Sequence, residues 1–409
     1  MFDLRHAILA YWRVRQIRTR AQCDAVARRR LARWLRQSVP RVPFYQGRVS
    51  ASLADLPIVD KATQMADFGA FNRAGITDRM GWEAFAGSKH IGPLIVGAST
   101  GTSGNRGLFV ISQAERFRWL GTILAKAVPG FWRMRHRVAV LLPLNTPLYD
   151  SANRFARLNL RFFDLADDWA ADLCGFDPTI IIAPPKVLRL MAEQRLALRP
   201  KQVFAGAEAL DALDRAIVAE YFGQPVGQIY MATEGLFAVS CAQGTLHLCE
   251  DTMHFELPPF GDDPDLREVI ISDFSRDVQI MARYRMNDLI RLGPPCPCGL
   301  PQRSVAEVVG RADDCFDFAG TLITPDILRN AVVDADRRIT DFRVVQTGAA
   351  RIEVSIPPGC DIKAVRRALE AVLQRKAVHA EIDVTATEMF PDMSRKLRRV
   401  ENRFGRSRP

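Results

Sequence analysis

Apolar residues recur at helical spacing through roughly the first forty positions of the chain, where they are set among arginines. This pattern predicts helix over residues 4–38, with Trp12 and Trp34 among the apolar positions. The prolines within 39–45 end the helix, because a proline disfavours helical backbone at the residue before it. We therefore expect a helical N-terminal segment over 1–45.

Between about residues 115 and 230, helical patterns alternate with short apolar runs that are typical of buried strands. The clearest run, 179–183, is β-branched and is followed by two prolines, as buried parallel strands often are. Such alternation predicts an α/β fold with a parallel sheet flanked by helices. Ligands of these sheets bind beyond the carboxyl ends of the strands. Two polar clusters follow predicted strands at such ends, namely Gly206-Ala-Glu208 and Tyr230-Met-Ala-Thr-Glu234.

From 237 to 295 the pattern changes to short strands and turns, which predicts a β-rich subdomain. After Gly310-Arg-Ala-Asp-Asp314 it changes again, to the order β-α-β-β-α-β, with 316–318 as the first strand. That order predicts a small ferredoxin-like α+β domain. We expect the chain to divide into a large N-terminal domain over 1–310 and a small C-terminal domain over 311–409.

The composition is that of an ordinary globular protein, because 48% of the 409 residues are apolar and 25% are charged. No apolar run is long enough for a membrane-spanning helix. No signal-peptide pattern is present either, so we expect a cytoplasmic location. Eight cysteines in a chain of this length do not make a disulfide framework, and we expect thiols or metal ligands instead.

The net charge of +10 is concentrated near the two ends of the chain. Nine arginines lie between Arg13 and Arg36, and six basic residues between Lys396 and Arg408. Such segments are most often solvated faces, but they also suit a membrane surface or an acidic carrier protein. No zinc-finger, helix-turn-helix or RNA-binding pattern accompanies them, which argues against a nucleic-acid partner.

A loop of small hydroxyl residues and glycines, Ser99-Thr-Gly-Thr-Ser-Gly104, lies between two short apolar runs. Glycines let the backbone approach an anion closely, so the N–H groups and hydroxyls of such a loop suit a triphosphate. No Gly-Lys-Ser/Thr sequence follows and no helix pattern opens there, which excludes a Walker loop.

Together these clusters resemble the adenylate-forming superfamily of acyl- and aryl-CoA ligases, and most nearly its phenylacetate–CoA ligase and CapK-like branch. The resemblance extends from Val42 to Lys396. In that family an equivalent loop holds the β and γ phosphates of ATP. This implies the same role here for Ser99, Thr100, Gly101, Thr102, Ser103 and Gly104. The lysine that usually follows is replaced by Asn105-Arg106, so the resemblance makes Arg106 the natural cation at the phosphates.

The resemblance also implies roles for the polar clusters at the strand ends. Gly206, Ala207 and Glu208 would form the adenine-proximal turn. Tyr230 would stack on adenine, Thr233 would contact the α phosphate, and Glu234 would hold Mg²⁺, a cation that prefers oxygen ligands.

Three further positions match the nucleotide site and the mobile C-terminal domain of that family. Asp288, in Tyr284-Arg-Met-Asn-Asp288, would receive the ribose hydroxyls, although Met286 and Asn287 depart from the usual Thr-Gly. Arg311 would contact ribose or phosphate at a hinge where Asp313 or Asp314 absorbs the rotation. Lys396 would be the adenylation lysine, which bridges the substrate carboxylate and the phosphates of ATP.

Cys241, His247, Cys296 and Cys298 offer three sulfurs and one imidazole, a donor set that suits tetrahedral Zn²⁺. The phenylacetate–CoA ligase branch resembles this arrangement. Because four protein ligands close the coordination shell, we expect a structural metal. Cys249 and His254 are alternative ligands, and a chance grouping stays open because Cys-x-Cys is tighter than the common Cys-x₂-Cys.

The resemblance implies that ATP and Mg²⁺ activate a carboxylic acid as acyl-AMP, and that a thiol of CoA or of a phosphopantetheine carrier then accepts the acyl group. The branch suggests an aromatic acid, similar to a hydroxybenzoate or phenylacetate, in secondary metabolism. Three alternatives stay open: acyl transfer onto an acidic protein, a degenerate non-catalytic nucleotide-binding protein, and a membrane-surface adaptor built on the basic N-terminal helix.

Overall fold

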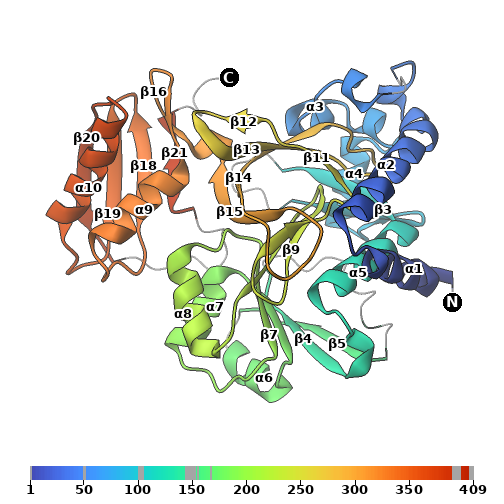
Figure 1. The fold of residues 1–409 in the computed structure, drawn as a ribbon, viewed down its shortest axis with the longest axis horizontal. Helices are drawn as coiled ribbons and strands as arrows, with labels where there is room; N and C mark the ends of the chain where they lie inside the picture. The colour runs from blue at the N-terminus through green and yellow to red at the C-terminus, as the bar shows by residue number, and fades with distance from the viewer. Residues whose placement is uncertain are drawn as a thin grey trace.

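A computed structural model of the chain describes residues 2–48, 52–99, 106–142, 153, 156–165, 168–388 and 398–404. A large mixed sheet occupies the centre of the molecule (Figure 1). The N-terminal helices lie on one side of this sheet, and the C-terminal residues form a smaller unit on the opposite side. None of the helices in the described part has both the length and the apolarity needed to cross a bilayer.

One half of the large sheet is parallel, in the order β5-β4-β6-β7-β8. These strands are β4 (His136–Val140), β5 (Leu158–Phe162), β6 (Ile180–Ala183), β7 (Gln202–Gly206) and β8 (Gly227–Ala232). The accompanying helices are α5 (Gln113–Ala127), α6 (Trp169–Phe176), α7 (Pro185–Glu193) and α8 (Ala212–Phe222). The predicted α/β class is confirmed, because apolar strands alternate along the chain with amphipathic helices.

The other half of the large sheet is antiparallel and continues from β8, so the β-rich part shares a sheet with the parallel strands. Its strands are β9 (Gly235–Ser240), β10 (Leu246–Leu248), β11 (His254–Glu256), β12 (Pro259–Phe260), β13 (Asp263–Ser272), β14 (Tyr284–Leu292) and β15 (Ser304–Arg311). A tight turn joins β8 to β9, and this turn carries Thr233 and Glu234.

The N-terminal residues form two helices, α1 (Phe2–Gln16) and α2 (Arg20–Gln37), where we predicted one. The break falls at Thr19, whose side chain accepts a hydrogen bond from the Gln22 backbone while the Gln22 side chain accepts from that of Thr19. This reciprocal capping box starts a new helix. Helix α1 packs tightly on α5, where a Cβ at Gly121 would lie 2.0 Å from the Ala7 carbonyl oxygen.

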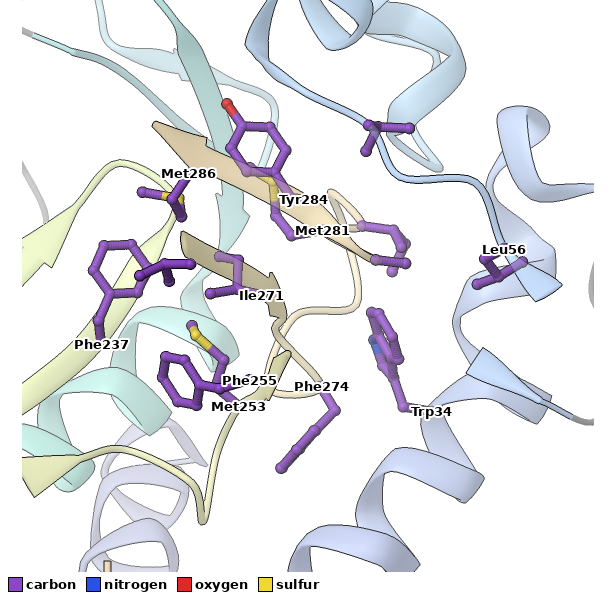
Figure 2. Packing of buried hydrophobic residues seen from close by; sticks show 14 of the residues in the cluster. Trp34, Leu56, Phe237, Met253, Phe255, Ile271, Phe274, Met281, Tyr284 and Met286 are labelled. Atoms are coloured by element: carbon purple, nitrogen blue, oxygen red, sulfur yellow. The ribbon is translucent and has the colours of Figure 1, made fainter. Parts of the chain in front are cut away.

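Helix α2 packs on the antiparallel half of the sheet. Its Trp34 belongs to the same core as Met253, Phe255 and Phe274 (Figure 2). The chain then forms short turns of 3₁₀ helix, followed by α3 (Lys61–Ala66) and α4 (Asp78–Ala86). Strands β1 (His90–Ile91), β2 (Leu94–Ala98) and β3 (Leu108–Ser112) make a small antiparallel sheet beside them.

The C-terminal unit has its own apolar core and a sheet in the order β20-β19-β18-β21. Its elements are β16 (Phe316–Phe318), β17 (Thr321–Ile323), α9 (Pro325–Ala335), β18 (Arg343–Gly348), β19 (Arg351–Ile356), α10 (Ile362–Arg375), β20 (Glu381–Ala386) and β21 (Val400–Asn402).

The predicted first strand of this unit, 316–318, is a strand but pairs differently from the ferredoxin-like order. It forms a hairpin with β17, because Ala319 and Gly320 both adopt positive φ, as the two central residues of a tight hairpin turn do. The place beside β18 is taken by β21, which runs parallel to it.

Candidate active site

A cavity of about 1680 Å³ lies at the carboxyl ends of β7 and β8. Its walls also come from β14, β15, α2, α5 and the first residues of the C-terminal unit. This is where ligands of parallel sheets are expected to bind. The predicted site residues that line it are Ser99, Gly206, Ala207, Glu208, Tyr230, Thr233, Glu234, Asp288 and Arg311.

Glu234 stands in the turn between β8 and β9 and is only 6% exposed. One of its carboxylate oxygens accepts a hydrogen bond from the Thr233 hydroxyl at 2.8 Å, and the other accepts from the Tyr284 hydroxyl at 3.2 Å. Burial, and then the Glu234 carboxylate, raise the pKa of Tyr284, so the phenol stays protonated and donates. These two bonds fix the carboxylate in the cavity wall, where its oxygens suit a hard cation.

Lys61 is a cavity residue that the sequence analysis missed. Its ammonium nitrogen lies 3.8 Å from the Glu234 carboxylate. The position results from two contacts along the chain. Val59 pairs with β14 through the backbone of Arg283 and Arg285, and Asp60 caps α3, of which Lys61 is the first residue. Asp60 could have been recognised in the sequence as the N-cap of a helix. No local sequence pattern, however, indicates that this helix lies beside Glu234.

Tyr230 and Asp288 meet across the cavity wall, where the phenol donates to the carboxylate at 2.5 Å. Burial, and then the neighbouring carboxylate, hold the pKa of Tyr230 well above its ordinary value. Asp288 lies on β14 directly opposite Arg311 on β15. This register places the predicted hinge arginine beside the predicted ribose ligand, and the Arg311 guanidinium lies 2.8 Å from the Asp313 carboxylate.

The turn after β7 enters the cavity with Ala207 in the left-handed region, at φ of 66°. The Glu208 side chain in this turn is buried, and its carboxylate lies 3.4 Å from the ammonium of Lys186 on α7. Removing two opposite charges together from water favours their pairing. Glu208 therefore helps to hold the turn against α7 while the backbone of the turn lines the cavity.

The structure describes only the ends of the predicted phosphate loop. Thr100, Gly101, Thr102, Ser103 and Gly104 lie outside the described residues. Ser99 and Gly107 close the base of the loop, because Ser99 N–H donates to the Gly107 carbonyl at 2.8 Å and Gly107 N–H donates to the Ser99 hydroxyl at 2.7 Å.

Arg106 does not join the cavity wall among the described residues. Its guanidinium lies over the rings of Trp82 and Phe85, 5.1 and 5.6 Å from their centroids. Lys61 instead passes Gly107, where a Cβ would stand 3.2 Å from the lysine Cε. Lys61 is therefore a cation of the cavity wall beside the base of the loop, and the role predicted for Arg106 at the phosphates stays a prediction.

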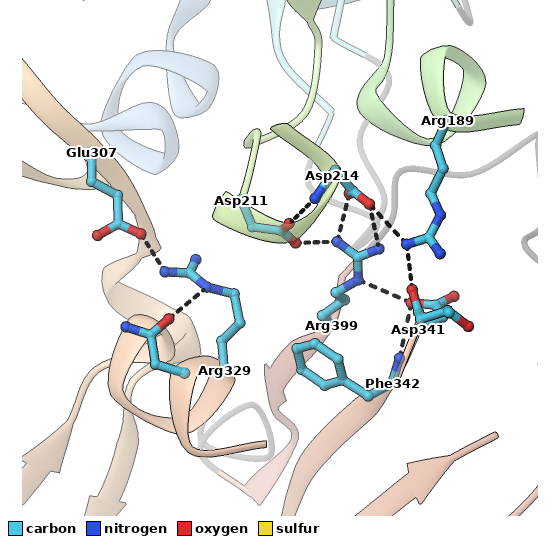
Figure 3. Close-up of polar contacts among 10 residues, drawn as sticks. Arg189, Asp211, Asp214, Glu307, Arg329, Asp341, Phe342 and Arg399 are labelled. Atoms are coloured by element: carbon cyan, nitrogen blue, oxygen red, sulfur yellow. Dashed lines mark hydrogen bonds and ion pairs between the residues drawn. The ribbon is translucent and has the colours of Figure 1, made fainter. Parts of the chain in front are cut away.

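Lys396 also lies outside the described residues, whereas Arg398 and Arg399 shortly after it line the cavity. Arg398 pairs with Asp314, and Arg399 pairs with Asp211 and Asp214 at the start of α8 (Figure 3). Arg399 of the C-terminal unit thus forms ion pairs with α8 of the large sheet's helical layer at one edge of the cavity.

No protein-family model matches the sequence, and no curated protein matches it either. Solved structures do match. A 2-hydroxyisobutyryl-CoA ligase in its postadenylation state, in complex with 2-HIB-AMP, overlays with a TM-score of 0.66 at 17% identity, over 93% of this chain and 90% of that one. The amide bond synthetase McbA from Marinactinospora thermotolerans overlays with a TM-score of 0.55 at 14% identity, over 75% and 68%. ATP-bound MatB from Rhodopseudomonas palustris gives 0.55 at 14%, over 73% and 65%. The chain has the fold of the adenylate-forming ligases.

On this adenylate-forming fold, the four predicted zinc ligands come together away from the large cavity. The ligand atoms of Cys241, His247, Cys296 and Cys298 all lie within 4.8 Å of one another. The Cys298 sulfur is 3.3 Å from Nε2 of His247, whose Nδ1 is 3.0 Å from the Gln302 carbonyl oxygen. Such a carbonyl orients a metal-bound imidazole. The donor set and its spacing fit a closed tetrahedral Zn²⁺ site, and the alternatives Cys249 and His254 are not part of this group.

Proposed function

We propose that the protein uses ATP to convert a carboxylic acid into an acyl-adenylate and then passes the acyl group to a thiol. The observation that carries the proposal is the presence of two hydrogen-bonded carboxylates, Glu234 and Asp288, with a lysine, Lys61, on the wall of one cavity. Carboxylates coordinate magnesium ions and accept hydrogen bonds from ribose hydroxyls, and an ammonium group forms ion pairs with phosphates. The solved structures with this fold include one ligase in complex with an acyl-adenylate and one protein bound to ATP.

In the first step, an oxygen of the substrate carboxylate forms a bond to the α phosphorus of ATP, and pyrophosphate leaves. Glu234 would hold Mg²⁺, which neutralises charge on the phosphates. Lys61 would stabilise the developing charge on the same groups, and Lys396 would bridge the carboxylate and the phosphates. Asp288 would receive the ribose hydroxyls, with Tyr230 holding the carboxylate in position and presenting its ring to adenine.

In the second step, a thiolate attacks the acyl carbon and AMP leaves. We propose CoA as the thiol, because a CoA ligase is among the proteins with this fold. A phosphopantetheine carrier is the alternative acceptor. An aromatic acid similar to a hydroxybenzoate or phenylacetate remains our substrate proposal. We also propose that the small unit, residues 311–409, rotates between the two steps, and that Zn²⁺ holds the β9–β10 hairpin to the β14–β15 loop.

Pyrophosphate exchange into ATP tests the adenylation step. We expect exchange that depends on one class among benzoic, phenylacetic, cinnamic and fatty acids, and that is lost in Lys396→Ala and Glu234→Gln. ATP binding is measured separately by calorimetry. If the protein binds ATP but no acid supports exchange, it is a non-catalytic nucleotide-binding protein and the proposal is wrong. Metal analysis of the purified protein tests the zinc site, with one zinc per chain as the expected result.

A further inference from the structure

Four large apolar side chains are exposed together on α1 and on the turn that follows α5. They are Ile8, Leu9, Trp12 and Trp132, and between 37% and 52% of each is exposed. The rings of Trp12 and Trp132 are stacked, with their centroids 5.3 Å apart. Ile8 and Leu9 lie one turn before Trp12, so the helix places them on the same face. We call these four residues the apolar patch.

The other face of α1 holds the apolar patch in place. Ala7 and Tyr11 are buried in a core that includes residues of α5. Tyr11 also fixes the turn that carries Trp132. Its ring centroid lies 4.8 Å from that of Trp132, and its hydroxyl accepts a hydrogen bond from the Gly130 N–H at 3.2 Å. Helix α1 therefore packs on the protein with one face and presents the patch to solvent with the other, at the side of the molecule opposite the C-terminal unit (Figure 1).

Apolar residues that are exposed singly are common on protein surfaces, whereas a contiguous group marks a site of interaction. The apolar patch is such a group, because its members share a helix face or touch through their rings. Among the described residues, the other large exposed apolar side chains come from separate segments: Ile58, Met80, Leu300, Leu322 and Phe404. The patch is therefore a local feature of the surface.

Positive charge flanks the apolar patch. Four exposed arginines lie close to its members in the sequence, namely Arg5, Arg13, Arg133 and Arg135. The segments that contain the patch and these arginines, 4–18 and 129–137, have no aspartate or glutamate. An anionic partner is favoured here, because the arginines attract it and no acidic residue of these segments opposes it.

The size and composition of the apolar patch favour a lipid surface over a protein. A specific protein–protein interface takes about 20 to 30 residues from each partner and needs a complementary shape. A lipid surface needs no matching shape, and an amphipathic helix binds it through a few apolar side chains and basic residues. Tryptophan rings are enriched at the level of lipid headgroups, and arginine keeps its guanidinium there while its stem is apolar.

We infer that the apolar patch and the four arginines dock the protein onto an anionic membrane surface, with α1 lying in the plane of the interface. The apolar side chains enter the headgroup layer, and the arginines form ion pairs with lipid phosphates and carboxylates. The inference does not depend on the proposed function. Ala10 and Val14 of the same helix line the large cavity, so docking places this end of the cavity beside the lipid surface.

Flotation of the full-length protein with lipid vesicles tests the docking surface. Vesicles of phosphatidylcholine alone are compared with vesicles that also contain phosphatidylserine, each at low and at high salt. We expect the protein to bind the anionic vesicles about tenfold or more tightly than the neutral ones, and the difference to shrink as salt screens the arginines. Failure to bind the anionic vesicles, or equal binding to both kinds, would overturn the inference.

Replacing both tryptophans of the apolar patch removes its rings. We expect Trp12→Ser combined with Trp132→Ser to weaken binding to the anionic vesicles about tenfold or more. Leu322→Ser is the matched control, because Leu322 is 42% exposed and belongs to the C-terminal unit, on the side of the molecule away from α1. That variant should bind like the wild type. Unchanged binding in the double tryptophan variant contradicts the inference.

A second variant covers the case in which the double tryptophan variant does not fold. Arg133→Gln combined with Arg135→Gln changes only exposed charge, and we expect it to weaken binding to the anionic vesicles about tenfold. Arg366→Gln combined with Arg367→Gln removes the same charge from exposed positions on α10, and should have little effect. Equal losses in the two variants would mean that net charge alone attracts the lipid, and the docking surface would be wrong.

A protein partner on the apolar patch would give a different result. Analytical ultracentrifugation detects a second copy of the chain, and a pull-down with an acidic carrier protein detects that class of partner. If the wild type binds either one, Trp12→Ser with Trp132→Ser abolishes that binding, and the wild type does not bind anionic vesicles, a protein covers the patch and the inference is overturned. Vesicle binding by a wild type that remains monomeric supports it.

Discussion

At the nucleotide end of the cavity, two of the contacts join residues that are neighbours in sequence or on adjacent strands. Thr233 donates to Glu234 one residue later, and Asp288 faces Arg311 across two adjacent strands. In another part of the cavity wall, between α2 and α5, the contacts join distant parts of the chain: Asp251 accepts hydrogen bonds from Lys126 of α5 and Arg30 of α2. Strand order and a tight turn suffice to build these two contacts, whereas the contacts between α2 and α5 exist only once helices from the N-terminal region pack on the sheet.

This difference predicts that substitutions in the two regions act on different properties. The region between α2 and α5 contains charges that are almost completely removed from water, so taking away one partner leaves an uncompensated buried charge. The nucleotide end presents its polar groups to the cavity, where they are available to a ligand. Changes there should alter binding and catalysis more than folding.

The largest effect that we expect is loss of stability in Lys126→Met. The side chains of Lys126 and Asp251 are 11% and 1% exposed, and removing the lysine leaves a buried carboxylate without its counter-charge. We expect the free energy of unfolding in urea to fall by about 3–5 kcal/mol. Arg161→Met is the control, because Arg161 pairs with Asp172 at the surface and should cost less than about 1 kcal/mol. Similar losses in the two variants would remove the distinction between the two regions.

Lys61→Ala should produce the next largest effect, which we expect on catalysis and not on stability. Lys61 is a cation in the cavity wall near Glu234 and the base of the phosphate loop. We expect kcat/KM for pyrophosphate exchange to fall about 100-fold, or about 2.7 kcal/mol. The unfolding free energy should change by less than about 1 kcal/mol, because the lysine is partly exposed. Lys89→Ala, at a half-buried bend outside the cavity, is the control. Normal exchange in Lys61→Ala would assign the phosphate contact to another residue.

The same contrast explains what could be predicted from the sequence. The α/β class follows from the alternation of apolar strands and amphipathic helices, and that prediction is confirmed. The clusters that contain Glu234 and Asp288 were visible because each follows or occupies a predicted strand. The structure brings these residues together on one cavity wall.

The parts that were not predicted depend on tertiary contacts. Lys61 reaches the site through the pairing of Val59 with β14, which leaves no local pattern. In the sequence, Asp251 is one acidic residue in a predicted turn, and no pattern indicates that α2 and α5 will cover it. The hairpin at Ala319 and Gly320 was missed because alanine is a rare residue at positive φ. Sequence patterns predict helices and strands, but they do not indicate which distant elements line the same cavity.

Tyr230→Phe tests the nucleotide end with a smaller change. The variant keeps the ring but removes the hydroxyl that donates to Asp288 at 2.5 Å. We expect the KM for ATP to rise about tenfold, or about 1.4 kcal/mol, because the carboxylate loses a hydrogen bond that holds its position. The preference among acids should not change, since Tyr230 belongs to the nucleotide end. Tyr221→Phe, at a tyrosine of α8 outside the cavity, is the control. A shift in acid preference in Tyr230→Phe would show that the nucleotide end also selects the acid.

The smallest effect is expected for Arg106→Ala, although the resemblance placed this residue at the phosphates. Its guanidinium lies against Trp82 and Phe85, an arrangement that stabilises a surface by about 0.5–1 kcal/mol. We therefore expect kcat/KM for exchange to fall less than about threefold, together with a small loss of stability. Arg106→Lys keeps the charge and should behave almost like the wild type. The opposite outcome would be a loss of kcat/KM as large as that of Lys61→Ala, with activity restored in Arg106→Lys. That result would mean that Arg106 leaves the aromatic rings when ATP binds and contacts the phosphates, as the sequence resemblance implies.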